Sequence, residues 1–218
     1  GLALVLLVVA GLLVQAQLEA RREAEKAEAA QASLNAMLAE ETPDAMNRER
    51  LAGTLAAWRT ELRDQRSRAA EEYNFAELAR SVRDPRSPVA GKPEAQVRLQ
   101  VLGRMQTLFG WMASTLQNYN AAKPLVVREL SGTAPKEIKV YAGPDRRLYY
   151  TEGGAIRQRN WSELSPPVMA AIVAGALHET QPFPPREAVM GAPAFASFYS
   201  LPELMDALRK GRPKRIGK

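Results

Sequence analysis

Residues 1–14, GLALVLLVVAGLLV, contain no charged or polar side chain, and residues 18–38, LEARREAEKAEAAQASLNAML, follow as a charged, alanine-rich helical pattern. Strong helix formers dominate the second stretch, so the sequence predicts one continuous helix over residues 1–41. The apolar run is shorter than the ~20 residues that a membrane-spanning helix needs, and the chain does not begin with Met. We expect a membrane helix over residues 1–16 that is truncated at its N-terminus. A signal-like segment and a buried helix are the alternatives.

A helical stalk is predicted over residues 17–82. Small and apolar residues recur at steps of three and four from Ala20 to Met37, which is a seam suited to packing against another helix. A break at residues 41–44 precedes a second helical pattern over residues 44–82, with one skipped step around Gln65. Because a short turn favours antiparallel helices, we expect a hairpin.

The segment 83–123 is predicted to be a linker followed by a third helix. RDPRSPVAGKP at residues 83–93 holds three prolines and a glycine, which is typical of a loop or hinge. Residues 94–120 then carry an apolar face at helical spacing. This face is more apolar than that of the second helical pattern, so the third helix is expected at the centre of the helical packing.

The periodicity changes after Pro124 to short β-like runs separated by glycine-containing turns. This pattern predicts a small antiparallel sheet of three or four strands, covered by a helix over residues 168–179, in an α+β domain spanning 124–180. Residues 181–218 are expected to hold an extended aromatic and proline segment, a short helix from Leu201 to Lys210, and a basic tail. The fold class is therefore α+β, mostly α.

The composition restricts the chemistry. There is no Cys and only one His, His178, so disulfides, thiolate metal sites and multi-histidine clusters within one chain are excluded. No motif supplies a catalytic constellation, and we predict no catalytic, cofactor-binding or metal-ligating residue. His178 is expected to serve as a favourable charge at a helix C-terminus.

The strongest local pattern is YYTEGGAIRQRNWSELSPPVMAAIVAGAL at residues 149–177, a glycine turn between two strands, a Trp-x-x-Leu-x-Pro motif and an amphipathic helix. Together with the helical pattern before it, roughly residues 70–177, it resembles a module in extracytoplasmic parts of membrane-anchored bacterial proteins, some of them kinase-associated. The resemblance implies a scaffold or interaction role, and a location outside the cytoplasm on a bacterial inner membrane. It implies no catalytic residue.

Aromatic side chains mark a candidate contact surface. Aromatic residues are enriched at interface cores, and the segment 181–199 carries several of them with few charges. The predicted partner-binding residues are Trp161, Phe183, Phe195, Phe198 and Tyr199. The same segment could instead be a strap that covers the core of its own domain, and the sequence leaves both interpretations open.

The excess positive charge lies in the tail. Six of the 30 basic residues fall within the last ten positions, which leaves 24 basic against 24 acidic residues in the rest of the chain. Such a tail favours contact with anionic lipid head groups or an acidic partner, and we predict no nucleic-acid binding. Its residues are Arg209, Lys210, Arg212, Lys214, Arg215 and Lys218.

These observations favour a single-pass, membrane-anchored accessory or scaffold subunit. Its predicted partners are integral membrane protein subunits of a larger complex and the lipid bilayer. The alternative is an extracytoplasmic sensor region in which ligand binding is relayed through the helical stalk. An enzyme directed at the cell envelope is a third hypothesis.

Overall fold

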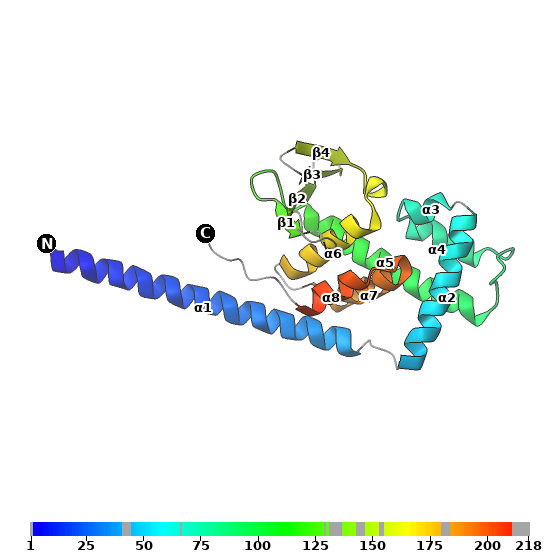
Figure 1. Ribbon diagram of the computed structural model, residues 1–218, viewed down its shortest axis with the longest axis horizontal. Helices are drawn as coiled ribbons and strands as arrows, with labels where there is room; N and C mark the ends of the chain where they lie inside the picture. Colours follow the sequence, from blue (N-terminus) through cyan, green and yellow to red (C-terminus); the bar gives the residue numbers. More distant parts are fainter. Residues whose placement is uncertain are drawn as a thin grey trace.

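A computed structural model describes residues 2–40, 45–65, 67–128, 130, 137–142, 147–152, 155–179 and 184–210. The chain is mostly helical with one small antiparallel sheet (Figure 1), which confirms the predicted α+β, mostly α class. Its elements are α1 (Leu2–Glu40), α2 (Ala45–Asp64), α3 (Arg68–Glu71), α4 (Phe75–Arg83), α5 (Pro93–Leu116), β1 (Leu125–Arg128), β2 (Glu137–Ala142), β3 (Leu148–Glu152), β4 (Ala155–Arg159), the 3-10 turn η1 (Trp161–Glu163), α6 (Pro166–Glu179), α7 (Arg186–Tyr199) and α8 (Pro202–Lys210).

The first helix runs without interruption from the apolar end into the body of the protein. At about 1.5 Å per residue it is roughly 60 Å long, and only its C-terminal part contacts the body, through α7 and α8. Leu34 and Leu38 are buried there, and the Gln31 side chain donates a 2.8 Å hydrogen bond to the Leu208 carbonyl. The N-terminal part projects away from all other elements (Figure 1).

In the part of the chain that the structure describes, no helix combines the length and apolar character of a membrane span. The predicted membrane helix over residues 1–16 is therefore not supported. Within the described residues the apolar run Leu2–Val14 covers about 20 Å, whereas the hydrocarbon core of a bilayer is about 30 Å thick.

The predicted antiparallel hairpin is wrong. The helix α2 leaves α1 at a steep angle (Figure 1) and packs against α7 rather than along α1. The second helical pattern is also divided into α2, α3 and α4, with the first interruption at the skipped step around Gln65. Leu55 and Trp58 on α2 are buried because they face α7, which is a better apolar surface than the alanine-rich seam.

The helices α5 and α7 form the centre of the molecule and make the most extensive contact between any two elements. The predicted third helix is confirmed as α5, but the expectation of an extended surface segment after residue 181 is wrong for α7. Small residues let α7 approach α5 closely: a Cβ atom on Gly191 would lie 2.5 Å from the Arg104 carbonyl oxygen. Residues 186–199 therefore form a helix despite their proline and glycine, because several faces of this helix are buried in the core.

The sheet is a four-stranded meander in the order β1-β2-β3-β4, with every neighbouring pair antiparallel, which confirms the predicted sheet. Leu125, Val127, Ile138 and Val140 face the core and are buried, with α6 packed most closely on β1. The predicted covering helix is thus confirmed as α6. It covers the β1 side of the sheet, and β4 lies at the opposite edge (Figure 1).

Candidate functional site

The structure buries two of the five predicted partner-binding aromatics in the core. Phe195 and Phe198 are 0% and 1% exposed, while Trp161 and Tyr199 are half-buried. Phe183 lies outside the described residues. The segment belongs to the core of its own fold, so the structure favours the interpretation in which it covers that core over the one in which it forms a partner surface.

These side chains belong to a continuous aromatic cluster that includes residues the sequence did not group with them. Phe109 on α5 lies 5.4 Å from Phe195 and 5.6 Å from Trp161 between ring centroids. Tyr73, which precedes α4, lies 5.5 Å from both Phe109 and Tyr199. Because these residues come from α5, α7, η1 and the turn before α4, the cluster joins the helical body to the end of the sheet.

Two buried hydroxyl groups anchor this cluster to the backbone. Tyr73 donates a 2.6 Å hydrogen bond to the Leu164 carbonyl, and Tyr199 donates a 2.7 Å hydrogen bond to the Ala70 carbonyl. Burial raises the pKa of both hydroxyls above the ordinary tyrosine value, and the neighbouring Tyr73 raises the pKa of Tyr199 further. Both tyrosines therefore remain neutral donors at physiological pH, which is a structural role.

The structure describes two of the six predicted tail residues and the histidine. Arg209 and Lys210 are exposed at the end of α8, and Arg212, Lys214, Arg215 and Lys218 fall outside the described residues. His178 is in the last turn of α6, as expected, with its Nε2 atom 3.3 Å from the Ala207 carbonyl oxygen.

A cleft of about 210 Å³ opens between α2, the end of α4, the loop that follows and the start of α5. It combines two arginines, two carboxylates and an apolar wall. The lining residues are Trp58, Glu61, Leu62, Gln65, Ser81, Val82, Asp84, Arg86, Ser87, Pro88 and Arg98.

Arg98 is the most constrained charge in this cleft. It is 9% exposed, its Nη2 atom donates a 2.9 Å hydrogen bond to Glu61 Oε2, and its guanidinium carbon lies 4.9 Å from the centroid of the Trp58 ring. Its Nε atom is buried without a hydrogen-bond partner among the described residues. The ion pair and the aromatic face together hold one planar cation at the cleft wall.

The cleft wall connects directly to the aromatic core. Trp58 contacts Phe198 edge to face, with ring centroids 5.1 Å apart, and Phe198 is on α7, which also contacts α1. A displacement of Trp58 would therefore be transmitted to the packing of α7.

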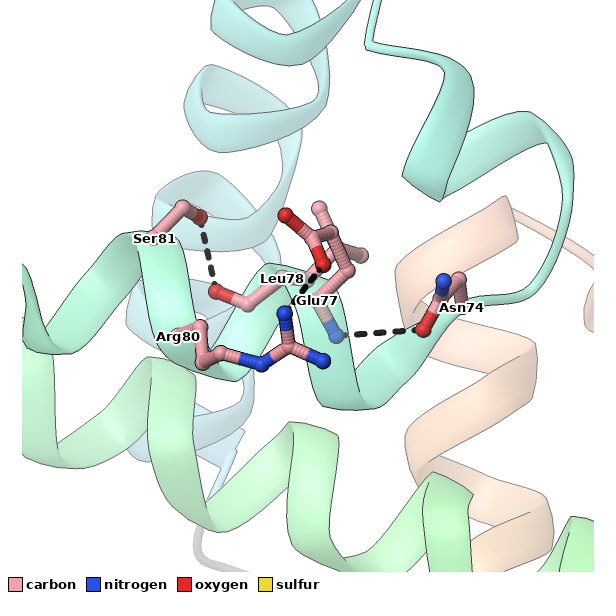
Figure 2. Close-up of polar contacts among 5 residues, drawn as sticks. All are labelled: Asn74, Glu77, Leu78, Arg80 and Ser81. Carbon is pink, nitrogen blue, oxygen red and sulfur yellow. Dashed lines mark hydrogen bonds and ion pairs between the residues drawn. The ribbon is translucent and has the colours of Figure 1, made fainter.

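The helix α4 contributes Ser81 and Val82 to the cleft lining, and Figure 2 shows the polar contacts along this helix. Its first turn is capped by the Asn74 side chain, which accepts a 3.1 Å hydrogen bond from the Glu77 amide. The Arg80 side chain donates to Glu77 on the exposed face at 2.8 Å, and the Ser81 hydroxyl donates to the Leu78 carbonyl at 2.7 Å. This capped helix packs Leu78 into the core and thereby places Ser81 and Val82 at the cleft.

The chemistry available in the cleft is recognition of a small polar molecule. Within the described ranges, no group of three or more His, Cys, Asp or Glu side chains could hold a metal ion. Cations and carboxylates both line the cleft, beside an apolar surface. The volume is below the range of about 300–1,000 Å³ typical of drug-sized ligand sites, so an occupant of amino-acid size would fit.

Sequence analysis did not find this cleft. The sequence predicts the loop 83–93, but Glu61 and Arg98 are separated by 37 residues. Neither residue carries a motif, and only the folded chain brings them together.

No family model, no curated protein and no solved structure matches this chain.

Proposed function

We propose that this protein is an accessory or scaffold protein that is tethered to a lipid bilayer by the apolar end of α1 and binds protein partners through its body. The observation that carries the proposal is the continuity of α1. One helix joins a run of apolar residues, Leu2 to Val14, to a docked end at Leu34 and Leu38.

The exposure along α1 supports a tethering role. The side chains of residues 17–26 are exposed, so this part of the helix receives no cover from the body. A helix docked at one end holds its other end at a distance that is set by its length. The apolar residues at that far end would lose contact with water on entering a bilayer, which is favourable by about 25 cal/mol per Å² of apolar surface.

Binding rather than catalysis is proposed because Arg98, the buried cation of the cleft, already has partners within the protein. Arg98 is paired with Glu61 and stacked on Trp58, an arrangement that fixes its position. The protein partners that we propose are subunits of a membrane complex.

The test is flotation with vesicles of uncharged phosphatidylcholine, which isolates apolar insertion from electrostatic attraction. The variant Leu6→Gln/Val9→Gln should lower the vesicle-bound partition coefficient at least about a hundredfold, because each apolar side chain contributes about 1.5–3 kcal/mol when buried. The matched control Ala20→Gln/Ala24→Gln alters the exposed part of the same helix and should leave partitioning unchanged. Equal flotation of the wild type and the Leu6/Val9 variant would contradict the tether.

A second candidate is a sensor in which the cleft binds a small ligand and α1 relays the change. The specific observation is the chain of contacts from Trp58 to Phe198 and from α7 to α1. The cleft lies among α2, α4 and α5 rather than in the predicted α+β domain of residues 124–180. The paired charges and apolar wall favour a zwitterion of amino-acid size.

A further inference from the structure

The outer edge of the sheet is the most exposed regular element of the body. All five residues of β4 are exposed, and Ile156 is 66% exposed, more than any other large hydrophobic side chain among the described residues. No described strand pairs with the free edge of β4, since the sheet ends there (Figure 1). An unpaired edge presents a row of backbone donors and acceptors to which another chain can add.

The two faces of β4 carry different chemistry. Ile156 is paired with Thr151 and therefore points to the outer face, away from the core, whereas Arg157 is paired with Tyr150 and points to the core-facing side. Arg159, opposite Leu148, shares the face of Arg157. Because α6 covers the β1 side of the sheet, both arginines extend beyond the helical layer and remain exposed.

These arginines are weakly paired within the chain. Arg159 lies 3.9 Å from Glu163, with the two side chains 44% and 45% exposed. The same Glu163 oxygen also accepts a hydrogen bond from the Asn160 amide. Arg157 forms no ion pair with any described residue. The core-facing side of β4 is therefore a row of positive charge open to a partner.

This charge argues against a second copy of the chain as the partner. Two β4 strands pairing antiparallel about a dyad at Arg157 would place Arg157 against its own mate, and a dyad at Gln158 would place Arg157 against Arg159 twice. Like charges directly opposite on adjacent strands are destabilising. Acidic side chains at the same positions would be favourable.

We infer that β4 accepts an extended acidic peptide segment of a partner protein as a fifth strand, with acidic side chains over Arg157 and Arg159 and apolar side chains beside Ile156. This inference rests on the proposed scaffold function and names the class of partner segment that the scaffold binds. Backbone hydrogen bonds along the edge supply affinity, and the alternation of charge and apolar surface supplies specificity.

The test measures binding of fluorescent ten-residue peptides to the full chain in the absence of lipid, so that its outcome is independent of membrane attachment. A peptide of alternating Glu and Val should bind, and one of alternating Lys and Val should not. In Arg157→Glu/Arg159→Glu the preference should reverse, with about a tenfold loss for the Glu peptide. Unchanged peptide preference in this variant overturns the proposal.

A second measurement separates strand addition from charge attraction alone. In an added strand, alternate residues direct their amides toward β4. Two further peptides carry N-methyl groups on the backbone amides of all Glu residues or of all Val residues. One of these two peptides should therefore fail to bind, and the other should bind like the unmethylated peptide. Binding that survives both methylations, or is lost with both, overturns strand addition. Circular dichroism establishes that the substituted chain, altered only at exposed positions, remains folded.

Discussion

Gly191 is the tightest point in the contact between α5 and α7. A Cβ atom at this position would lie 2.4 Å from Leu108 Cβ and 2.5 Å from the Arg104 carbonyl oxygen. The second of these atoms belongs to the backbone of α5, so no side-chain rotation relieves the overlap. Substitution Gly191→Ala must therefore separate the two helices.

Two opposing terms set the size of the effect. Alanine is favoured over glycine in a helix by about 1 kcal/mol, whereas overpacking a well-filled core costs about 1–3 kcal/mol, and occasionally more. The overlap with both a backbone oxygen and a fully buried Leu108 places the cost at the upper end. We expect a net destabilisation of about 2 kcal/mol, which for a chain of this length lowers Tm by about 4–8 °C.

The assay is thermal and urea unfolding of Gly191→Ala beside Gly103→Ala. Gly103 is on the exposed side of α5, and a Cβ atom there would meet nothing within 4 Å. The control should gain up to about 1 kcal/mol from helix propensity, so the two variants should shift Tm in opposite directions. If Gly191→Ala is as stable as the wild type while Gly103→Ala is stabilised, the close approach of α5 and α7 is refuted.

Two further predictions concern the tyrosines and the cleft. Because burial raises the pKa of Tyr73 and Tyr199 in the folded state, their stabilisation is fully present below the ordinary tyrosine pKa near 10. It is lost as the pH rises above that value, because the unfolded state then binds fewer protons. The free energy of unfolding, measured in urea, should fall above pH 10 by up to about 1.4 kcal/mol per pH unit per tyrosine. In the variant Tyr73→Phe/Tyr199→Phe this decline should be shallower. An equally steep decline in the variant would contradict the role given to the two tyrosines. For the cleft, calorimetry should detect binding of L-leucine but much weaker binding of its methyl ester and of 4-methylpentanoate, and Arg98→Met should abolish it. Equal binding of all three molecules would rule out zwitterion recognition.

The alternation of the four β-like runs and the glycines between them predicted the sheet and its covering helix. Helix propensity predicted α1, and apolar side chains at helical spacing predicted α5. These elements depend on residues close together in the chain, where side-chain period and turn chemistry act. The skipped step at Gln65 was likewise a local signal, although it marks the end of α2 rather than a flaw in a longer helix.

The direction of α2 and the burial of α7 depended on distant partners. Trp58 is buried because Phe198 lies against it, and nothing near Trp58 in the sequence identifies α7 as the surface it faces. The aromatic residues of α7 fit either a core or a partner surface from the sequence alone, because both are rich in aromatic side chains.

The sequence by itself determined the order and type of most elements, the apolar start of α1, the charge excess of the tail and the absence of cysteine chemistry. Only the tertiary structure decided which apolar faces meet, because a face packs against whatever complementary surface the whole chain provides. The Arg98 to Glu61 pair spans 37 residues and the Tyr199 to Ala70 hydrogen bond spans 129. The cleft and the free edge of β4 likewise exist only where folding brings some segments together and leaves others uncovered.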